Sequence, residues 1–254
     1  MILAIDVGNT NIVIGGFSEE TILFRERVST KPTATDLEYA TMIKTAMEMN
    51  DITPETVTGG ILSSVVPSVT NTIKRACQKA CQITPLIVGP GIKTGLSILI
   101  DNPKQLGSDL VVDAVAGINL YPVPQIIIDM GTATTYSVID KNRNYLGGLI
   151  TTGMAISADA LISRTSQLPR VSLEVPKKVI GTNTVDSLKS GILYSTAASM
   201  EGIITRIEQE LGEKCTVIAT GGLAGLVTPL AKRDIILDDD LLLKGLMLIY
   251  NKNQ

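Results

Sequence analysis

The chain has 254 residues, of which 44% are hydrophobic and 19% charged, so it can bury a large core in one or two domains. A net charge of −3, only 3% aromatic residues and no basic block argue against a nucleic-acid partner. The first residues lack the pattern of a signal peptide, and no run of about 18 apolar residues predicts a membrane span. We therefore expect a cytoplasmic protein without a membrane partner.

Histidine is absent from the chain, which excludes a Ser-His-Asp hydrolase and leaves Asp, Glu, Lys, Tyr or Cys as the candidate bases. The three cysteines, Cys77, Cys81 and Cys215, do not have the spacing of a disulfide framework and fit a reducing compartment. Cys77 and Cys81 are four positions apart and share a face of a predicted helix. They are either small core residues, which we favour, or part of a metal site that needs further ligands.

The first half of the chain alternates predicted strands and helices. Its apolar patterns predict strands over 2–7, 11–17, 21–30, 59–66 and 84–91 and helices over 33–50, 68–82 and 108–121. The link Gly8-Asn9-Thr10 is short, so the first two strands should form a hairpin. Thr35 or Asp36 can cap the first helix, and Ser108 is the expected N-cap of the third.

The second half repeats this order. A strand ends at Asp129 and resumes as a hydroxyl-rich strand, and helices are predicted over 155–164 and 184–211. The segment 215–227 predicts a strand, a Gly-Gly turn and a helix. Asp6-Val7-Gly8 and Asp129-Met130-Gly131 are 123 positions apart, close to half the chain. This duplication predicts an α/β fold with two lobes, 1–115 and 116–254, each a mixed sheet with flanking helices, and a cleft between them.

The duplicated turn has a composition suited to phosphate. Glycine lets backbone N–H groups approach a ligand closely, and donors follow it in both copies: Asn9, Thr10 and Asn11 in one, Thr132, Thr134 and Thr135 in the other. The aspartates are hard oxygen ligands suited to Mg²⁺ or a monovalent cation. The alternative is that each Asp-x-Gly is only a hairpin turn. Neither a P-loop nor a dinucleotide-binding fingerprint is present.

This arrangement resembles the two phosphate motifs of the superfamily that contains acetate kinase, sugar kinases, heat-shock chaperones and actin. Gly221-Gly222 resembles the adenosine motif of that superfamily, although such a pair between a strand and a helix can also be a plain turn. The resemblance implies a ribonuclease-H-like, actin-like ATPase fold for each lobe.

A closer resemblance covers most of the chain. Six segments resemble type III pantothenate kinases in order and spacing: DVGNT at 6–10, GPGIKTGLSI at 89–98, NPKQLGSD at 102–109, DMGTATT at 129–135, GTNT at 181–184 and TGGLAGL at 220–226. The resemblance implies transfer of the γ-phosphoryl group of ATP to pantothenate, the first step toward coenzyme A. It also implies a homodimer, Mg²⁺ with ATP, and dependence on K⁺ or NH₄⁺.

The resemblance further implies roles for individual residues. Asp109 is the expected catalytic base, Asp129 the ligand of the monovalent cation, and Asp6 a ligand of Mg²⁺ with ATP. The expected ATP contacts are Asp6, Val7, Gly8, Asn9, Thr10, Asn11, Ile12, Val13 and Thr132. The expected pantothenate contacts are Ile100, Gly107, Ser108, Asp109, Leu110 and Thr184, and the Thr184 segment should reach the substrate of the neighbouring subunit.

Asp109 has a second interpretation, as a first-turn carboxylate favoured by the helix dipole, which would favour its ionised form. The chain also departs from the usual family pattern at four positions: Leu110 replaces Arg, Ile100 an aromatic residue, Asp113 an asparagine and Thr152 a proline. Arginine is a bidentate partner for a carboxylate such as that of pantothenate, and Lys93 or Lys104 could replace it. Two alternatives to pantothenate phosphorylation therefore stand: a kinase for another small hydroxyl substrate, or a non-catalytic nucleotide- or metabolite-binding relative.

Overall fold

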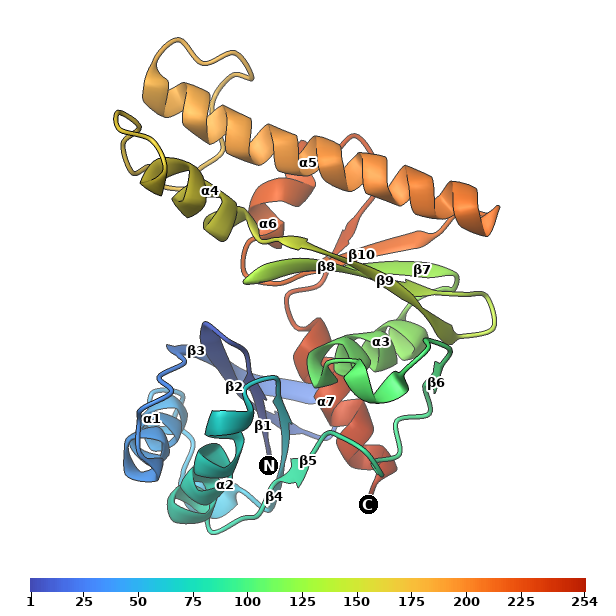
Figure 1. The fold of residues 1–254 in the computed structure, drawn as a ribbon. Helices are drawn as coiled ribbons and strands as arrows, with labels where there is room; N and C mark the ends of the chain where they lie inside the picture. The colour runs from blue at the N-terminus through green and yellow to red at the C-terminus, as the bar shows by residue number, and fades with distance from the viewer. The chain divides into compact units, whose positions relative to one another are not determined.

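A computed structural model describes residues 1–254, and the chain folds into two compact units (Figure 1). Unit 1 comprises Met1–Leu96, Asn102–Ala116 and Leu241–Gln254, and unit 2 comprises Ser97–Asp101 and Gly117–Asp240. The division near residue 116 lies beside the expected lobe boundary. The C-terminal segment belongs to unit 1, whereas the expected second lobe extended to residue 254.

Unit 1 is built on a five-stranded mixed sheet. Its strands are β1 (Ile2–Val7), β2 (Asn11–Ser18), β3 (Thr21–Ser29), β4 (Gly59–Ser64) and β5 (Leu86–Ile87), in the spatial order β3-β2-β1-β4-β5. β1, β2 and β3 are antiparallel neighbours, which confirms the predicted hairpin, and β4 and β5 run parallel to β1. The central strand β1 is an apolar run because helices cover both of its faces.

The alternation of side chains along β1 separates two apolar cores. Leu3, Ile5 and Val7 pack with the helices α1 (Asp36–Glu48) and α2 (Pro67–Cys81). Ala4 points to the other face, where it packs with α3 (Ser108–Leu120) and α7 (Leu241–Lys252). Short 3₁₀ turns cover Pro54–Thr56 and Pro103–Gln105. α7 is not among the predicted helices, although it supplies much of the second core.

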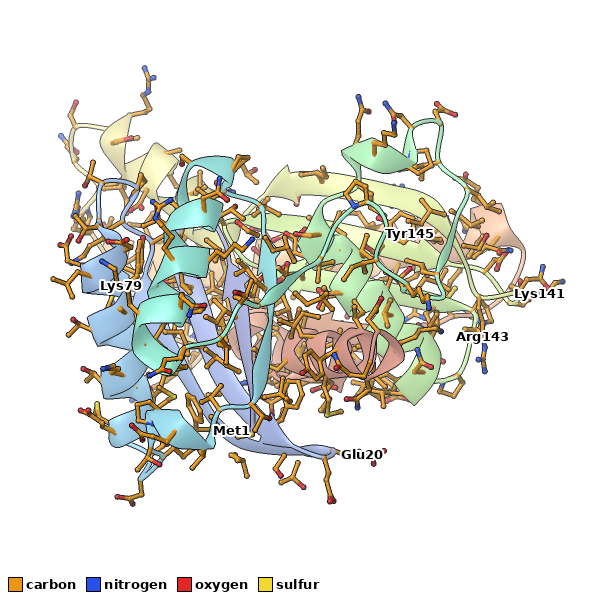
Figure 2. The ribbon with its side chains drawn as sticks, turned by 90° about the horizontal axis from the view of Figure 1, so that it is seen from below. Met1, Glu20, Lys79, Lys141, Arg143 and Tyr145 are labelled. Atoms are coloured by element: carbon orange, nitrogen blue, oxygen red, sulfur yellow. The ribbon has the colours of Figure 1, made fainter.

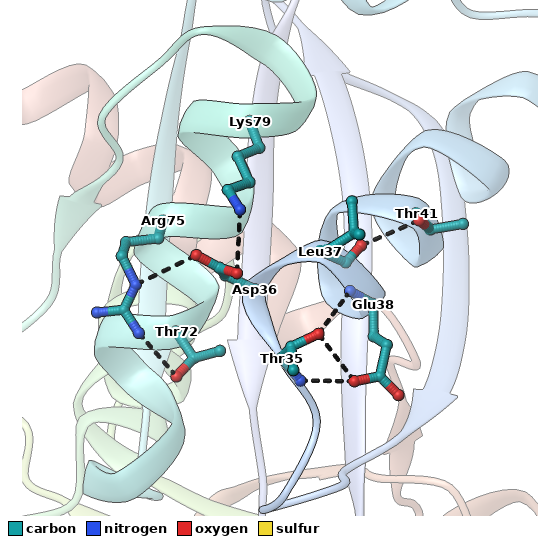
Figure 3. A network of polar contacts seen from close by, with 8 residues as sticks. All are labelled: Thr35, Asp36, Leu37, Glu38, Thr41, Thr72, Arg75 and Lys79. Carbon is teal, nitrogen blue, oxygen red and sulfur yellow. Dashed lines mark hydrogen bonds and ion pairs between the residues drawn. The ribbon is translucent and has the colours of Figure 1, made fainter.

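A capping box starts α1, as Figure 3 shows. The Thr35 hydroxyl accepts a hydrogen bond from the Glu38 amide at 3.3 Å, and the Glu38 carboxylate accepts one from the Thr35 amide at 2.7 Å. Thr35 is therefore the N-cap, one of the two predicted candidates. Asp36 is instead an anchor between helices, because its carboxylate lies 3.1 Å from Lys79 Nζ and 3.4 Å from Arg75 Nε on α2.

Cys77 and Cys81 lie in the core between α1 and α2. The Cys81 Sγ atom is 4.0 Å from Met47 Sδ. Burial raises the pKa of Cys77 to about 12 and that of Cys81 to about 11, so both are neutral thiols at physiological pH. Their surroundings support the core interpretation of this pair.

Unit 2 repeats the sheet of unit 1 and adds one strand. Its strands are β6 (Ser97–Ile98), β7 (Gln125–Met130), β8 (Ala133–Ile139), β9 (Asn144–Thr152), β10 (Thr216–Thr220) and β11 (Ile236–Leu237), in the order β11-β10-β7-β8-β9-β6. β7 takes the place of β1, with an antiparallel meander on one side and two parallel strands on the other. This repeat confirms the predicted duplication of a mixed sheet with flanking helices.

Four helical segments belong to unit 2 after β9: α4 (Met154–Ser163), α5 (Thr184–Leu211), the single turn α6 (Ala224–Val227) and the 3₁₀ turn Thr228–Leu230. α5 packs across the sheet through side chains that include Leu193, Met200 and Ile204. Lys141 and Arg143 mark the exposed turn between β8 and β9 (Figure 2). No helix has both the length and the apolar composition needed to cross a membrane.

Glu208 ties the end of α5 to the segments that follow it. The carboxylate accepts hydrogen bonds from Lys214 Nζ at 2.8 Å, from the Cys215 amide at 3.1 Å and from the Arg233 guanidinium. Burial alone would raise the pKa of Glu208, but the bonds from Arg233 and Lys214 outweigh it and lower the pKa to about 2. The buried carboxylate therefore stays ionised and paired at neutral pH.

Candidate functional site

Two carboxylates occupy equivalent places at the ends of the central strands. Asp6 is the penultimate residue of β1, and Asp129 is the penultimate residue of β7. Each lies level with a buried hydroxyl residue on the neighbouring parallel strand: Ser63 on β4 beside Asp6, and Thr220 on β10 beside Asp129. The two aspartates were predicted as site residues but Ser63 and Thr220 were not, because strand register decides which residues stand beside the aspartates.

The turn after Asp6 is held by its own backbone and by β3. The Gly8 amide donates to the Asn11 carbonyl at 3.0 Å, and the Thr30 hydroxyl donates to the Gly8 carbonyl at 2.7 Å. The side chains of Asn9 and Thr10 are exposed, whereas those of Val7 and Ile12 lie in the core. Within the predicted ATP loop 6–13, the exposed side chains are therefore those of the turn itself.

The turn after Asp129 has the same construction with one residue fewer. The Gly131 amide donates to the Ala133 carbonyl at 3.0 Å, and the Thr132 side chain is exposed. Met130 pairs with Thr134 across the turn, whereas Val7 pairs with Ile12. A glycine amide closes both turns, so each leaves a short stretch of backbone and hydroxyl groups accessible beyond a strand end.

The Asp129 carboxylate lies against Gly221, the first glycine of the Gly-Gly turn. Gly221 has φ +92°, and a Cβ at this position would collide with Asp129 Oδ1 and come within 2.7 Å of the Met130 backbone. Opposite Asp129 on β8 stands Thr135, whose Oγ1 atom is buried and has no hydrogen-bond partner. The end of β7 thus brings together a carboxylate, a buried hydroxyl and a close-packed glycine.

Asp109 lies in the first turn of α3. The Gly107 carbonyl accepts the first hydrogen bond of the helix, from the Val111 amide at 3.1 Å, so Gly107 is the N-cap. The prediction that Ser108 caps this helix was wrong, because the Ser108 hydroxyl is used elsewhere. A side chain at Gly107 would collide with the Asp109 carboxylate, so glycine is required for this approach.

The Ser108 hydroxyl joins the start of α3 to the end of β4. It lies 3.0 Å from the Ser63 hydroxyl, accepts from the Ser64 amide at 3.1 Å and donates to the Ser64 carbonyl at 3.1 Å. These contacts use the donor and both acceptor sites of one hydroxyl group. The backbone that carries Asp109 is therefore fixed to the strand next to β1.

The half-buried Asp109 carboxylate has a raised pKa. Burial raises it, and the hydrogen bonds that the carboxylate accepts from the backbone amides, including that of Leu110 at 2.8 Å, only partly oppose the effect. The helix dipole was expected to favour the ionised form and lower this pKa, but burial has the larger effect and raises it. A raised pKa makes the carboxylate a stronger base than an exposed aspartate.

The remaining predicted substrate contacts occupy different elements. Leu110 follows Asp109 in α3 and is half-buried. Ile100 follows β6 in unit 2. Its side chain lies near Gly147 on β9, since a Cβ added to that glycine would be 3.8 Å from Ile100 Cγ2. Thr184 is the first, exposed residue of α5, where Asn183 is the N-cap and accepts from the Asp186 amide at 2.9 Å.

A cavity of about 530 Å³ lies in unit 2 and is not lined by any of the residues expected to contact ATP or pantothenate. Its walls come from β8, the end of β9, α4 and the first half of α5. They are rich in hydroxyl groups, including Thr151, Ser157, Ser187, Ser195 and Ser199, and none of the lining residues is charged.

The family model for type III pantothenate kinase matches residues 2–206. A curated type III pantothenate kinase from Halalkalibacterium halodurans is 44% identical over 253 residues, covering 100% of both chains. The chain belongs to the type III pantothenate kinase family. Family membership supports ATP-dependent phosphorylation of pantothenate, in coenzyme A biosynthesis, as the activity of this kinase.

Solved structures show the same fold at low sequence identity. A conserved putative Baf family transcriptional activator from Campylobacter jejuni has a TM-score of 0.60 at 18% identity and covers 99% of this chain and 98% of its own. The activator of 2-hydroxyisocaproyl-CoA dehydratase from Clostridium difficile, with bound ADPNP, has a TM-score of 0.56 at 17% identity, covering 98% and 93% of the two chains. The predicted actin-like α/β fold class is confirmed by the two mixed sheets and by this likeness.

The departures from the usual family pattern fall near α3 and β9. Asp113, in place of the usual asparagine, is 1% exposed and lies one helical turn after Asp109. Thr152 ends β9 and lines the cavity of unit 2. Neither position is in the turns after Asp6 and Asp129, although Thr152 pairs with Ala133 at the second turn.

Gly221→Ala tests the packing around Asp129, with Gly212→Ala as the matched control. Both glycines have positive φ, +92° and +73°, but only Gly221 has atoms within 4 Å of the added Cβ. We expect Gly212→Ala to lose about 1–2 kcal/mol of unfolding free energy from backbone strain alone and to keep its activity. Gly221→Ala should lose more and have reduced kinase activity because the carboxylate must move. Urea unfolding and a kinase assay check this; equal behaviour of the two variants would contradict it.

Proposed function

We propose that Asp109 is the base that receives the proton of the pantothenate hydroxyl as the γ-phosphoryl group is transferred. The environment of Asp109 supports this role. Its carboxylate is half-buried and has a raised pKa, and its turn is fixed to β4 through Ser108. Phosphoryl transfer depends chiefly on positioning and charge neutralisation, so a well-placed carboxylate suffices without a histidine.

ATP is assigned to the two glycine turns. In residues 6–13, the backbone groups and the exposed Asn9 and Thr10 side chains are suited to phosphate oxygens, while Val7 and Ile12 contribute backbone only. Thr132 presents its exposed hydroxyl from the second turn. Asp6 would hold Mg²⁺ with ATP, since a carboxylate beside the Ser63 hydroxyl at a strand end suits a hard cation. Bound Mg²⁺ supplies charge neutralisation for the phosphates.

Asp129 is assigned to K⁺ or NH₄⁺. The buried Thr135 Oγ1, which has no hydrogen-bond partner and stands opposite Asp129, is the observation that supports this. A carboxylate and a hydroxyl oxygen together suit a monovalent cation, which takes several oxygen ligands in place of its hydration shell. A bound cation supplies positive charge at this strand end.

Pantothenate is assigned to Gly107–Leu110, Ile100 and Thr184. Leu110 makes only apolar contacts with its side chain, where an arginine would pair with the substrate carboxylate. This substitution is the specific observation that favours the second candidate, a kinase for another small hydroxyl substrate. A non-catalytic nucleotide-binding relative is the third outcome, and turnover distinguishes all three.

The kinase assignment predicts pantothenate-dependent ADP release that Asp109→Asn abolishes, measured in a coupled assay. Because the pKa of Asp109 is raised, the rate should fall on acidification at a higher pH than for an ordinary aspartate. The neutral asparagine side chain should leave folding intact, since burial disfavours the carboxylate charge that the substitution removes. Asp234→Asn, at an exposed aspartate, is the control and should keep full activity. ATP binding without turnover on pantothenate or its analogues would contradict the assignment.

The cation assignment predicts that activity in K⁺ exceeds activity in Na⁺ for the wild type. Asp129→Ala should abolish this difference or the activity itself, because the carboxylate ligand is lost. The measurement is the initial rate against K⁺ concentration at constant ionic strength. Unchanged activation by K⁺ in Asp129→Ala would remove Asp129 from this role.

The homodimer is assigned to the outer face of unit 2 that α4 and α5 form side by side (Figure 1). α5 exposes only small uncharged residues over three turns: Ser187, Gly191, Ser195, Ala198 and Ser199. On the neighbouring helix α4, Ile156 is 43% exposed and Leu161 44%. An exposed helix face without charged residues, beside exposed apolar side chains, is typical of a contact with another protein, and a two-fold dimer pairs such a face with itself.

Ser195→Glu should therefore weaken the dimer, because it places a charge from each copy in the contact. Gln209→Glu adds a nearly isosteric charge at the exposed, polar end of α5 and is the matched control. Size-exclusion chromatography with light scattering over a range of concentrations measures the mass. A wild-type monomer, or a dimer unaffected by Ser195→Glu, would contradict this assignment.

A further inference from the structure

The C-terminal end of α7 binds a loop that lies 160 positions earlier in the chain. The Lys93 amide donates to Asn253 Oδ1 at 3.0 Å, and Asn253 Nδ2 donates to the Lys93 carbonyl at 2.9 Å. The second hydrogen of the same Nδ2 group is directed to the Ile249 carbonyl at 2.7 Å, within α7. One half-buried side-chain amide therefore holds both backbone groups of Lys93 and is itself fixed by its helix.

The neighbouring residue, Lys252, also reaches this loop. Lys252 Nζ lies over Gly95, so closely that a Cβ at Gly95 would collide with it. Gly95 has φ +74°, a conformation that glycine adopts without strain. Lys252 and Asn253 thus contact the loop at two points, and we name this pair of contacts the C-terminal clasp.

The clasped loop has little structure of its own. Residues 89–96 contain three glycines, two of them with positive φ, Gly91 at +95° and Gly95 at +74°. Its internal hydrogen bonds are few: the Ile92 amide donates to the Gly89 carbonyl at 3.2 Å, and the Leu96 amide donates to Thr94 Oγ1 at 3.2 Å. Glycine-rich backbone loses much conformational entropy when it is ordered, so an external anchor has a large effect here.

The loop leads directly into the residues assigned to pantothenate. Lys93 precedes Ile100 by seven positions and Gly107 by fourteen. The segment 97–101 belongs to unit 2 and the segments on either side of it belong to unit 1. The clasp therefore fixes the backbone of unit 1 just before the chain passes into unit 2 at Ser97.

We propose that Asn253 is a positioning residue for pantothenate binding, acting through the loop 89–96. It lies outside the residues 2–206 that the family model matches. The proposal rests on the proposed function, since it concerns the site assigned to Ile100 and Gly107–Leu110. Without the clasp, the loop samples more conformations, and substrate binding must order it.

Asn253→Ala tests the proposal, with Asn251→Ala as the matched control. Asn251 is the same residue type two positions earlier and is exposed, without any hydrogen bond to the loop. The KM for pantothenate should rise about five- to tenfold in Asn253→Ala, as expected for the loss of one to two hydrogen bonds, while the KM for ATP and the thermal midpoint stay near wild type. Asn251→Ala should match wild type in all three measurements.

Hydrogen exchange of residues 89–96 in the substrate-free protein provides a readout that does not depend on turnover. Exchange should be faster in Asn253→Ala than in wild type or Asn251→Ala. An unchanged KM for pantothenate in Asn253→Ala, or equal rises in the KM for both substrates with a lower thermal midpoint, would overturn the proposal. Absence of pantothenate turnover in the wild type would instead refute the proposed function, while the exchange rates still report whether the clasp orders the loop.

Discussion

The candidate site depends on the geometry at the end of the central strand of each unit, β1 and β7. In both units a buried apolar strand stops at an aspartate, a glycine amide closes the turn, and a hydroxyl residue on the neighbouring parallel strand stands level with the carboxylate. Asp6 is buried and Asp129 half-buried, and a carboxylate removed from water is costly unless a cation or a hydrogen-bond donor compensates for the lost hydration. The rigid sheet holds the charge in place, and the short turn keeps accessible backbone groups directly beyond it.

Hydroxyl groups fix two of the backbone segments that carry proposed site residues. The Ser108 hydroxyl attaches the start of α3 to β4, and the Thr30 hydroxyl attaches the first glycine turn to β3. A hydroxyl can donate and accept at once without bringing a charge near the reacting groups. At the end of α5, by contrast, two cations hold the Glu208 carboxylate ionised.

The C-terminal helix α7 contacts segments from the first half of the chain. α7 closes the second core of unit 1 on β1 and β4, and its last residues contact the loop 89–96. Unit 1 therefore contains segments from both ends of the chain. Chain order alone placed this helix in the second lobe, whereas packing places it with the first.

The sequence by itself determined the α/β class, the duplication, the two strand-end aspartates and the family. Each of these depends on local patterns: apolar runs of strand length, helical spacing, and glycine after a carboxylate. Tertiary structure alone decided that Ser63 and Thr220 stand beside the aspartates, that Gly107 rather than Ser108 caps α3, and that burial outweighs the helix dipole at Asp109. It also decided that Asn253 holds Lys93. Strand register, burial and contacts between distant segments arise only when the chain has folded. Local sequence patterns therefore do not predict them for individual residues.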